Sequence, residues 1–163
     1  MRKMTSEILI LTAITAALIA GLFYAYSCSV NIGLARLSNA GYIAAMQAIN
    51  KAILNPLFFV SFIGSLLLLP VSTFLHYQQP ISNRFIFLLI ATIIYIIGSF
   101  GVTIFGNVPL NEMLARFNLQ AASDEEIANQ RTKFELPWNR LHTIRTIASV
   151  ISLVMVLIAC VKG

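Results

Sequence analysis

Charged residues are scarce in this chain of 163 residues. They make up only 10% of it, and hydrophobic residues make up 58%, whereas a soluble domain carries about 25% charged residues. The 11 basic and 6 acidic side chains are too few to wet the whole surface, which excludes disorder, collagen-like repeats and most soluble folds. The length fits one domain, and we predict that most of its surface faces lipid.

Cysteine, histidine and clustered charge are also rare. Cys28 and Cys160 show no CxxC spacing and lie near opposite ends of apolar segments, which argues against a disulfide or a metal site. The 2 histidines supply too few strong ligands for a metal or haem. The net charge of +5 comes from basic residues scattered singly between apolar runs, unlike a nucleic-acid-binding patch. We therefore predict no nucleic-acid partner, no metal and no cofactor.

Four apolar runs are long enough to cross about 30 Å of hydrocarbon. They cover residues 8–30, 53–75, 85–106 and 141–161. The runs are continuous rather than alternating, which is typical of membrane helices and not of barrel strands. We predict an all-α fold: one integral membrane domain over residues 1–163, built as an antiparallel bundle of four transmembrane helices with short extramembrane helices.

The connections between these runs differ in length. Residues 76–84 are typical of a short hairpin between antiparallel helices. Residues 31–52 contain a break at 38–41 and then a helical stretch that can continue into the second span. In the longest connection, Ser123 and Glu126 have the spacing of a capping box. We predict a polar helix over about 124–135 that ends before Pro137 and lies outside the bilayer as a cover.

Polar residues gather on one side of the predicted bundle. An up-and-down topology places residues 31–52 and 107–140 on one side of the membrane, and both termini on the other. The charged, amide and aromatic residues near span ends on the first side are Asn31, Arg36, Asn50, Lys51, Asn55, Asn107, Asn111, Glu112, Trp138, Asn139, Arg140, His142 and Arg145. The opposite side holds a much thinner set. This asymmetry predicts a polar site at one end of the bundle.

Helical spacing indicates that part of this set points inward. The first stripe lies on the fourth span and consists of Trp138, His142, Arg145, Ser149 and Ser152, at steps of 4, 3, 4 and 3. The equivalent stripe on the second span consists of Lys51, Asn55, Phe58, Phe62 and Ser65. If both stripes face the interior, a polar mouth opens above an aromatic floor. Such a shape suits a flat, mostly apolar ligand with one polar edge.

Each of these residues also has a purely structural interpretation. Arg145 can snorkel to the headgroups, His142 can be a hydrogen-bonded interface residue, and Trp138 can anchor an aromatic belt. Asn107 can cap a helix, and Asn55 can bond across helices. Taken together, the set favours a site, because belts and caps do not require so many amides on one face.

Four segments resemble a known family. They are Gly-Leu-Phe-Tyr-Ala-Tyr-Ser at 21–27, Met-Gln-Ala-Ile-Asn-Lys-Ala-Ile-Leu-Asn-Pro at 46–56, Asn-Val-Pro-Leu-Asn at 107–111 and Trp-Asn-Arg-Leu-His-Thr-Ile-Arg-Thr at 138–146. They are similar to the anthrone-oxygenase-like membrane family, and the likeness covers nearly the whole chain. The last two motifs are fairly specific.

The resemblance implies a small four-span protein, some of whose fungal relatives oxidise anthrones to anthraquinones without an evident cofactor. Most bacterial members have no assigned activity. The motif positions of the family fall on Asn50, Asn55, Asn107, Asn111, Trp138, Asn139, His142 and Arg145. The resemblance also implies the bacterial cytoplasmic (inner) membrane as the location. No residue pattern marks an aromatic polyketide as the substrate of this chain.

Cofactor-free oxygenation needs a base and a group that stabilises the resulting anion. His142 is the one nearby side chain that ordinarily titrates near neutrality. We expect His142 to be the base, Arg145 to stabilise the anion, and Asn107 and Asn111 to contact a carbonyl or hydroxyl group.

Other interpretations remain open at this point. The same cavity fits a non-catalytic protein that binds a lipid or a quinone, and the polar face fits a structural partner of another membrane protein. The expected partners are the lipid bilayer and a small apolar or aromatic ligand. The sequence does not fix the substrate, the oligomeric state or the membrane orientation.

Overall fold

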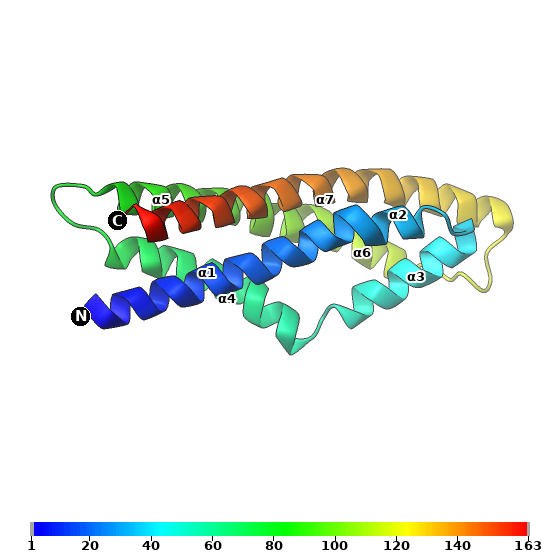
Figure 1. Cartoon of the computed structure of the whole chain (residues 1–163). Helices are drawn as coiled ribbons and strands as arrows, with labels where there is room; N and C mark the ends of the chain where they lie inside the picture. The colour runs from blue at the N-terminus through cyan, green and yellow to red at the C-terminus, as the bar shows by residue number, and fades with distance from the viewer. Residues whose placement is uncertain (1, 163) are drawn as a thin grey trace.

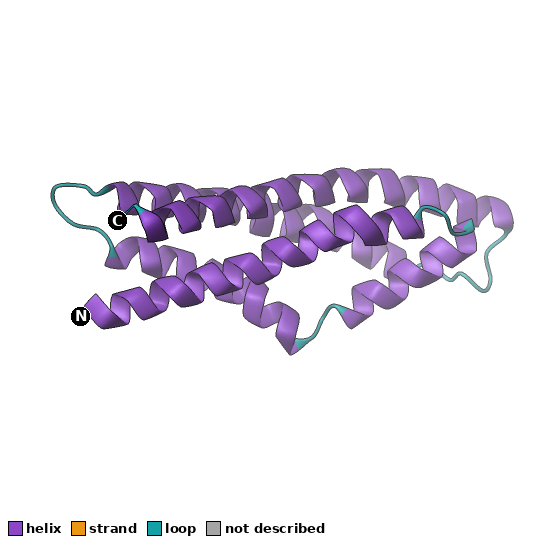
Figure 2. Cartoon of the chain, viewed as in Figure 1, coloured by secondary structure: helices purple, strands orange, loops and turns teal. Residues whose placement is uncertain are grey.

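The computed structural model describes residues 2–162, with side chains from residue 4 onward, and consists of helices laid along one long axis (Figures 1 and 2). The α-helices are α1 (Arg2–Ala25), α2 (Asn31–Leu34), α3 (Asn39–Ala52), α4 (Pro56–Leu75), α5 (Asn83–Ile94), α6 (Val108–Ala115) and α7 (Asp124–Val161). Three π-helical segments interrupt them: η1 (Tyr26–Val30), η2 (Tyr95–Gly101) and η3 (Thr103–Asn107).

Four continuous helical stretches of the described chain are long and apolar enough to cross a membrane. They cover Met4–Leu34, Pro56–Leu75, Asn83–Ala115 and Asp124–Val161. Both termini and the α4–α5 connection lie at one end of the molecule, whereas α2, α3, α6 and the start of α7 lie at the other (Figure 1). The predicted all-α bundle of four membrane-spanning helices is confirmed, and the chain has the features of a multi-pass membrane protein.

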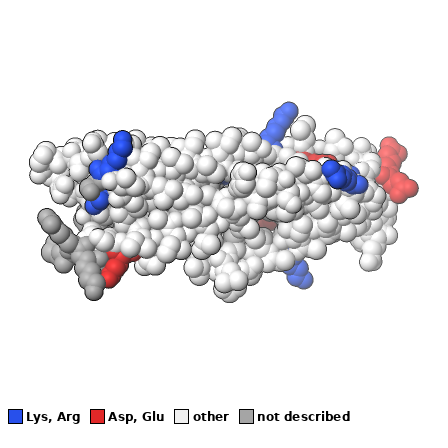
Figure 3. Space-filling model, viewed as in Figure 1, with Lys and Arg blue, Asp and Glu red and all other residues white. Residues whose placement is uncertain are grey.

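The surface of the bundle is apolar, as expected of a protein immersed in lipid. Large side chains such as Leu57, Phe74 and Phe105 are exposed. On the face drawn in Figure 3, a wide band without charged side chains separates the charged groups at the left end from those spread over the right part of the molecule. Apolar residues cover both the inside and the outside of the bundle. The helices are therefore held together by close packing and not by removal of apolar surface from water. The lipid bilayer is therefore a partner of this fold.

Close packing and buried hydroxyl groups hold the four helices together. A Cβ atom added to Gly98 would come within 2.7 Å of the Ala148 Cβ, so η2 and α7 touch backbone to side chain. Hydrogen bonds between the helices link pairs of buried hydroxyls, as in Thr12 to Ser72 at 2.6 Å. The Tyr95 hydroxyl donates to a carbonyl oxygen of α4 at 2.8 Å. Such bonds stabilise helix pairs in lipid, where the hydrophobic effect between helices is weak.

A cap outside the predicted spans continues three of the membrane helices. The 38 residues of α7 are about 57 Å long at the usual helical rise, nearly twice the thickness of the hydrocarbon core. The first part of α7 packs with α3 and α6 around a second core, whose buried members are Leu34, Tyr42, Ile43, Met46, Leu114, Ile127, Phe134 and Trp138. The cap (α2, α3, α6 and the first part of α7) thus has its own hydrophobic centre.

The prediction that Pro137 ends a separate polar helix is wrong. The capping box between Ser123 and Glu126 is present and starts α7, but the helix runs through Pro137 without a break. A proline inside a helix removes one backbone donor. Packing of Phe134 and Trp138 on the same side keeps both halves of α7 in line.

Two further boundaries differ from expectation. The helical stretch before the second span does not continue into it, because α3 ends at Ala52 and the Asn55 side chain caps α4 by accepting a hydrogen bond from the Phe58 amide at 3.1 Å. Conversely, the third span does not stop at residue 106. It passes through η3 into α6, where Pro109 occupies an early position.

Arg131 ties the cap together. Its guanidinium donates to the carbonyl oxygens of Ala35 at 3.1 Å and Leu37 at 2.8 Å, pairs with Glu135 at 2.7 Å, and lies 4.5 Å from the centre of the Tyr42 ring. Burial raises the pKa of the Tyr42 phenol, which therefore stays neutral. The carbonyls at the end of α2 are the ones that a helix leaves without internal partners.

We expect Arg131→Met to lower the free energy of unfolding by about 1.5–3 kcal/mol, because hydrogen bonds from a charged donor are lost. Thermal unfolding in detergent measures this as a lower Tm. Lys133→Met, which removes an exposed cation two residues away on the same helix, is the control and should leave Tm unchanged. Equal shifts for the two variants would contradict the assignment.

Candidate functional site

A small chamber lies where the bundle meets the cap. Its volume is about 100 Å³. The residues that line it are Leu22, Phe23, Tyr26, Ile49, Asn50, Ile53, Leu54, Phe58, Thr103, Val108, Asn111, Trp138, His142 and Arg145. They come from α1, η1, α3, the α3–α4 connection, α4, η3, α6 and α7, so every span contributes.

The inward stripe predicted for the fourth span is confirmed. Trp138, His142, Arg145, Ser149 and Ser152 are all buried. The first three line the chamber, whereas the two serines bond to neighbouring helices below it. Burial also rules out two structural interpretations. Trp138 is 3% exposed and does not anchor an aromatic belt, and Arg145 is 8% exposed and does not snorkel.

The aromatic floor is present in part. Phe58 lines the chamber and stacks on the buried Phe62, with ring centres 5.1 Å apart. Phe62 in turn stacks on Phe100 of η2 at 5.4 Å. Lys51, predicted for the same stripe, belongs instead to α3 and is exposed.

Arg145 and His142 form the polar centre of the chamber. The Nε and Nη2 groups of Arg145 lie 3.1 Å and 3.0 Å from His142 Nδ1. A guanidinium only donates hydrogen bonds, so Nδ1 is the acceptor and the neutral imidazole carries its proton on Nε2. Nε2 then donates to the Ser27 hydroxyl at 2.9 Å, and that hydroxyl donates to the Phe23 carbonyl oxygen at 3.1 Å. This chain of bonds holds the imidazole in one orientation. Because Nε2 donates to the Ser27 hydroxyl, His142 does not act as a base that activates Ser27 as a nucleophile.

The positive charge of Arg145 has no acidic partner among residues 4–162, where the ion pairs join Arg116 to Glu112 and Arg131 to Glu135. Its guanidinium instead lies over two aromatic rings, 4.3 Å from the centre of Phe23 and 5.2 Å from that of Trp138. Cation–π contacts compensate only part of the cost of burying a charge. The chamber is therefore suited to an anionic ligand group.

Trp138 connects the imidazole to the cap. Its ring stacks on His142 with centres 5.0 Å apart and planes 9° from parallel. Its indole Nε1 donates to Asn111 Oδ1 at 2.7 Å, and its backbone carbonyl accepts a bond from Asn107 Nδ2 at 3.3 Å. Asn107 makes no side-chain cap, so the capping interpretation of that residue is wrong.

The structure brings together five of the predicted site residues and separates the other three from the chamber. Asn50, Asn111, Trp138, His142 and Arg145 line it. The remaining three do not: Asn107 supports Trp138, Asn55 caps α4, and Asn139 is half-buried beside Trp138 on α7.

Several chamber residues on the first and third membrane spans were not predicted from the sequence. Phe23, Tyr26 and Thr103 line the chamber, and Ser27 bonds to His142. Tyr26, Ser27 and Thr103 lie in π-helical segments, which often occur at functional sites. The segment at 21–27 was a usable signal, because it carries the family resemblance, but an apolar run gives no spacing that predicts a π turn.

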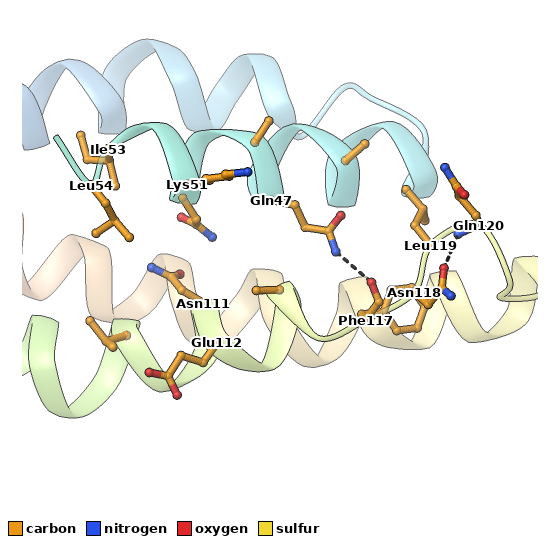
Figure 4. Close-up of a pocket in the computed structure, with 15 residues that line it drawn as sticks. Gln47, Lys51, Ile53, Leu54, Asn111, Glu112, Phe117, Asn118, Leu119 and Gln120 are labelled. Carbon is orange, nitrogen blue, oxygen red and sulfur yellow. Dashed lines mark hydrogen bonds between the residues drawn. The ribbon is translucent and has the colours of Figure 1, made fainter.

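A larger cleft lies beside the chamber, between α3 and α6 (Figure 4). Its volume is about 860 Å³, within the range of about 300–1,000 Å³ that ligand sites occupy. In Figure 4 the Asn111 side chain extends from α6 toward α3, and Gln47 bonds to the Phe117 carbonyl oxygen at 2.9 Å. Amide side chains, one lysine (Lys51) and one carboxylate (Glu112) supply the polar side chains of this cleft.

Searches of known proteins identify the family. A family model described as Anthrone oxygenase matches residues 57–155, from the start of α4 to within α7, including Trp138, His142 and Arg145. Curated proteins and solved structures give no significant match. The family match covers more than half of the chain and agrees with the predicted resemblance. The chain therefore belongs to the anthrone oxygenase family.

Proposed function

We propose that this protein oxidises an activated CH2 group of a flat aromatic ketone, such as an anthrone, with molecular oxygen in the chamber. The observation that carries the proposal is the buried Arg145 guanidinium, which lacks an acidic partner in the described part of the chain and faces an aromatic-lined space. Such a group stabilises an enolate oxygen, the charge that develops when the CH2 group loses a proton.

The reaction balances without a further reductant. Loss of a proton from the CH2 carbon gives an enolate, which donates electrons to O2 and forms a carbon–peroxide bond. The peroxide anion takes up the first proton. Removal of the second proton from that carbon then breaks the O–O bond and expels hydroxide, which becomes water with that proton, and a second ketone remains, so anthrone and O2 yield anthraquinone and one water. The protein must accept protons and stabilise the anion.

His142 is the group proposed to accept the proton, at Nδ1. In the structure this nitrogen accepts hydrogen bonds from two donors of Arg145. The ketone oxygen of the arriving substrate offers the guanidinium another acceptor, and it becomes a stronger one as negative charge develops on it during proton transfer. Arg145 can then turn from Nδ1 to the substrate oxygen, which frees Nδ1. Stacking on Trp138 and the bond to Ser27 keep the ring in place during this exchange.

The volume of the chamber indicates how a three-ring ligand is placed. About 100 Å³ admits only part of such a molecule, since ligand sites are usually several times larger. The remainder extends into the cleft between α3 and α6, which shares residues with the chamber.

The test uses the purified protein in detergent or nanodiscs with anthrone and air. We expect oxygen uptake and anthraquinone formation in equal molar amounts, above the rate of spontaneous oxidation measured with heat-denatured protein. His142→Ala is expected to lower the catalysed rate about 100-fold, as for loss of a general base. An equal rate in wild type and His142→Ala would exclude the base assignment. Saturable binding without turnover would instead support a non-catalytic binding protein.

A further inference from the structure

The chamber has two chemically distinct ends. Asn50 and Asn111 line both the chamber and the cleft, so they mark the opening between the two. Arg145 and His142 line the chamber alone and form its inner end. A ligand that enters from the cleft thus meets amides at the opening and a guanidinium at the back.

The Asn50 side chain carries a hydrogen-bond donor that nothing in the described chain satisfies. Its Nδ2 atom is buried and has no partner among residues 4–162. A buried donor without an acceptor is costly, and such groups in native proteins usually have a functional or solvent-related explanation. Because Asn50 lines the chamber at its opening, a ligand oxygen there lies next to the residue that carries this donor.

Asn111 supplies a second donor at the same opening. Trp138 Nε1 donates to Asn111 Oδ1 at 2.7 Å, which fixes the amide with its oxygen toward the indole. The Nδ2 group of Asn111 is then directed elsewhere, and Figure 4 shows this side chain extending toward α3, the helix that carries Asn50. Both ends of the chamber therefore offer donors.

We propose that Asn50 is a specificity-determining residue that binds a second ligand oxygen, so that the site selects flat rings with acceptor oxygens on opposite edges, the para-quinone class. The inference rests on the proposed function only in placing the first oxygen at Arg145. A ring held at both ends fits a para-quinone better than a compound with one oxygen, because the single-oxygen compound leaves the Asn50 donor unsatisfied. An anthrone therefore binds more weakly than the anthraquinone that its oxidation yields.

The experiment is equilibrium binding followed by Trp138 fluorescence. The chain has 1 tryptophan, and it lines the chamber, so a bound quinone quenches the signal directly. The probes are 2,3-dimethyl-1,4-naphthoquinone, whose blocked positions spare the exposed thiols of Cys28 and Cys160, and 1-naphthol, which has one oxygen. We expect wild type to bind the quinone more tightly than the naphthol.

Two variants test the residue itself. Asn50→Leu removes the donor, and Asn50→Asp replaces it by an acceptor of the same shape. We expect each to weaken quinone binding at least tenfold and naphthol binding less than twofold. Asn129→Leu, at an exposed position of α7, is the control and should change neither. Thermal unfolding of each variant verifies that it is folded.

The outcomes are distinct from those of the oxidation assay. Equal weakening of both ligands, unchanged quinone binding in the Asn50 variants, or no preference of wild type for the quinone would overturn the inference. Selective quinone binding that depends on Asn50, in a protein that does not oxidise anthrone, would refute the proposed oxidation and leave this inference standing. Oxidation of anthrone together with unselective binding would do the reverse.

Discussion

Arg145→Met is expected to lower the catalysed oxidation of anthrone at least about 100-fold, the usual effect of removing a donor that stabilises a developing anion. The same substitution should leave the protein as stable as wild type or more stable. A buried cation without an acidic partner costs desolvation energy, and apolar side chains of similar volume often replace buried charges without loss of stability. Activity and stability thus move independently or in opposite directions.

Two measurements on one preparation check this expectation: anthraquinone formation in air and thermal unfolding in detergent. Arg140→Met is the matched control, because Arg140 lies on the same helix but is exposed. It should change neither measurement. A large loss of stability in Arg145→Met, with activity reduced only in proportion to the unfolded fraction, would show that Arg145 serves mainly to hold His142 and Thr103.

Gly98→Leu is expected to lower the free energy of unfolding by about 2–3 kcal/mol, the upper part of the range for overpacking. For a chain of this size that corresponds to a fall in Tm of about 5–10 °C. The physical reason is the 2.7 Å separation between a Cβ at this position and the Ala148 Cβ. Any side chain larger than hydrogen forces η2 and α7 apart, next to the 2.8 Å bond between Ser99 and Ser149.

Matched variants separate this effect from the general cost of replacing glycine in a membrane helix. Gly21→Leu should leave Tm nearly unchanged, because an added Cβ at Gly21 meets no described atom within 4 Å. Gly98→Ala should also lower Tm. In the double variant Gly98→Ala/Ala148→Gly, part of that stability should return, because the opposing methyl group is gone. Equal losses at Gly98 and Gly21, or no recovery in the double variant, would contradict close packing at this point.

The number of spans and their order could be predicted, because a helix in lipid needs a long apolar run and nothing else in the chain supplies one. The inward face of the fourth span could also be predicted, since Trp138, His142 and Arg145 follow helical spacing. The ends of helices outside the hydrocarbon were harder to predict from the sequence. Pro137 is a strong local breaker, but α7 runs through it, and Phe134 and Trp138 on either side of it are both buried in the core of the cap.

The composition of the chamber could be predicted only in part. Polar residues in an apolar segment stand out, which identified Asn50, Asn111 and His142. Phe23 and Tyr26 are unremarkable in a run of apolar and aromatic residues, and their place in the chamber depends on tertiary packing. Asn55 had the same appearance in sequence as Asn50, but the break before Pro56 turned it into a helix cap. The spacing of residues assumes one continuous helix, and it does not predict that α3 ends at Ala52 and that α4 begins at Pro56.

The cap and the bundle share three unbroken helices, ending at Leu34, at Ala115 and, for α7, beginning at Asp124. Because each of these three helices is continuous, its part in the cap cannot tilt unless its part in the bilayer tilts as well. In contrast, α3 has a connection of a few residues at each end, before Asn39 and after Ala52, and it forms one wall of both cavities. The wall that α3 forms is therefore not itself part of a membrane-spanning helix.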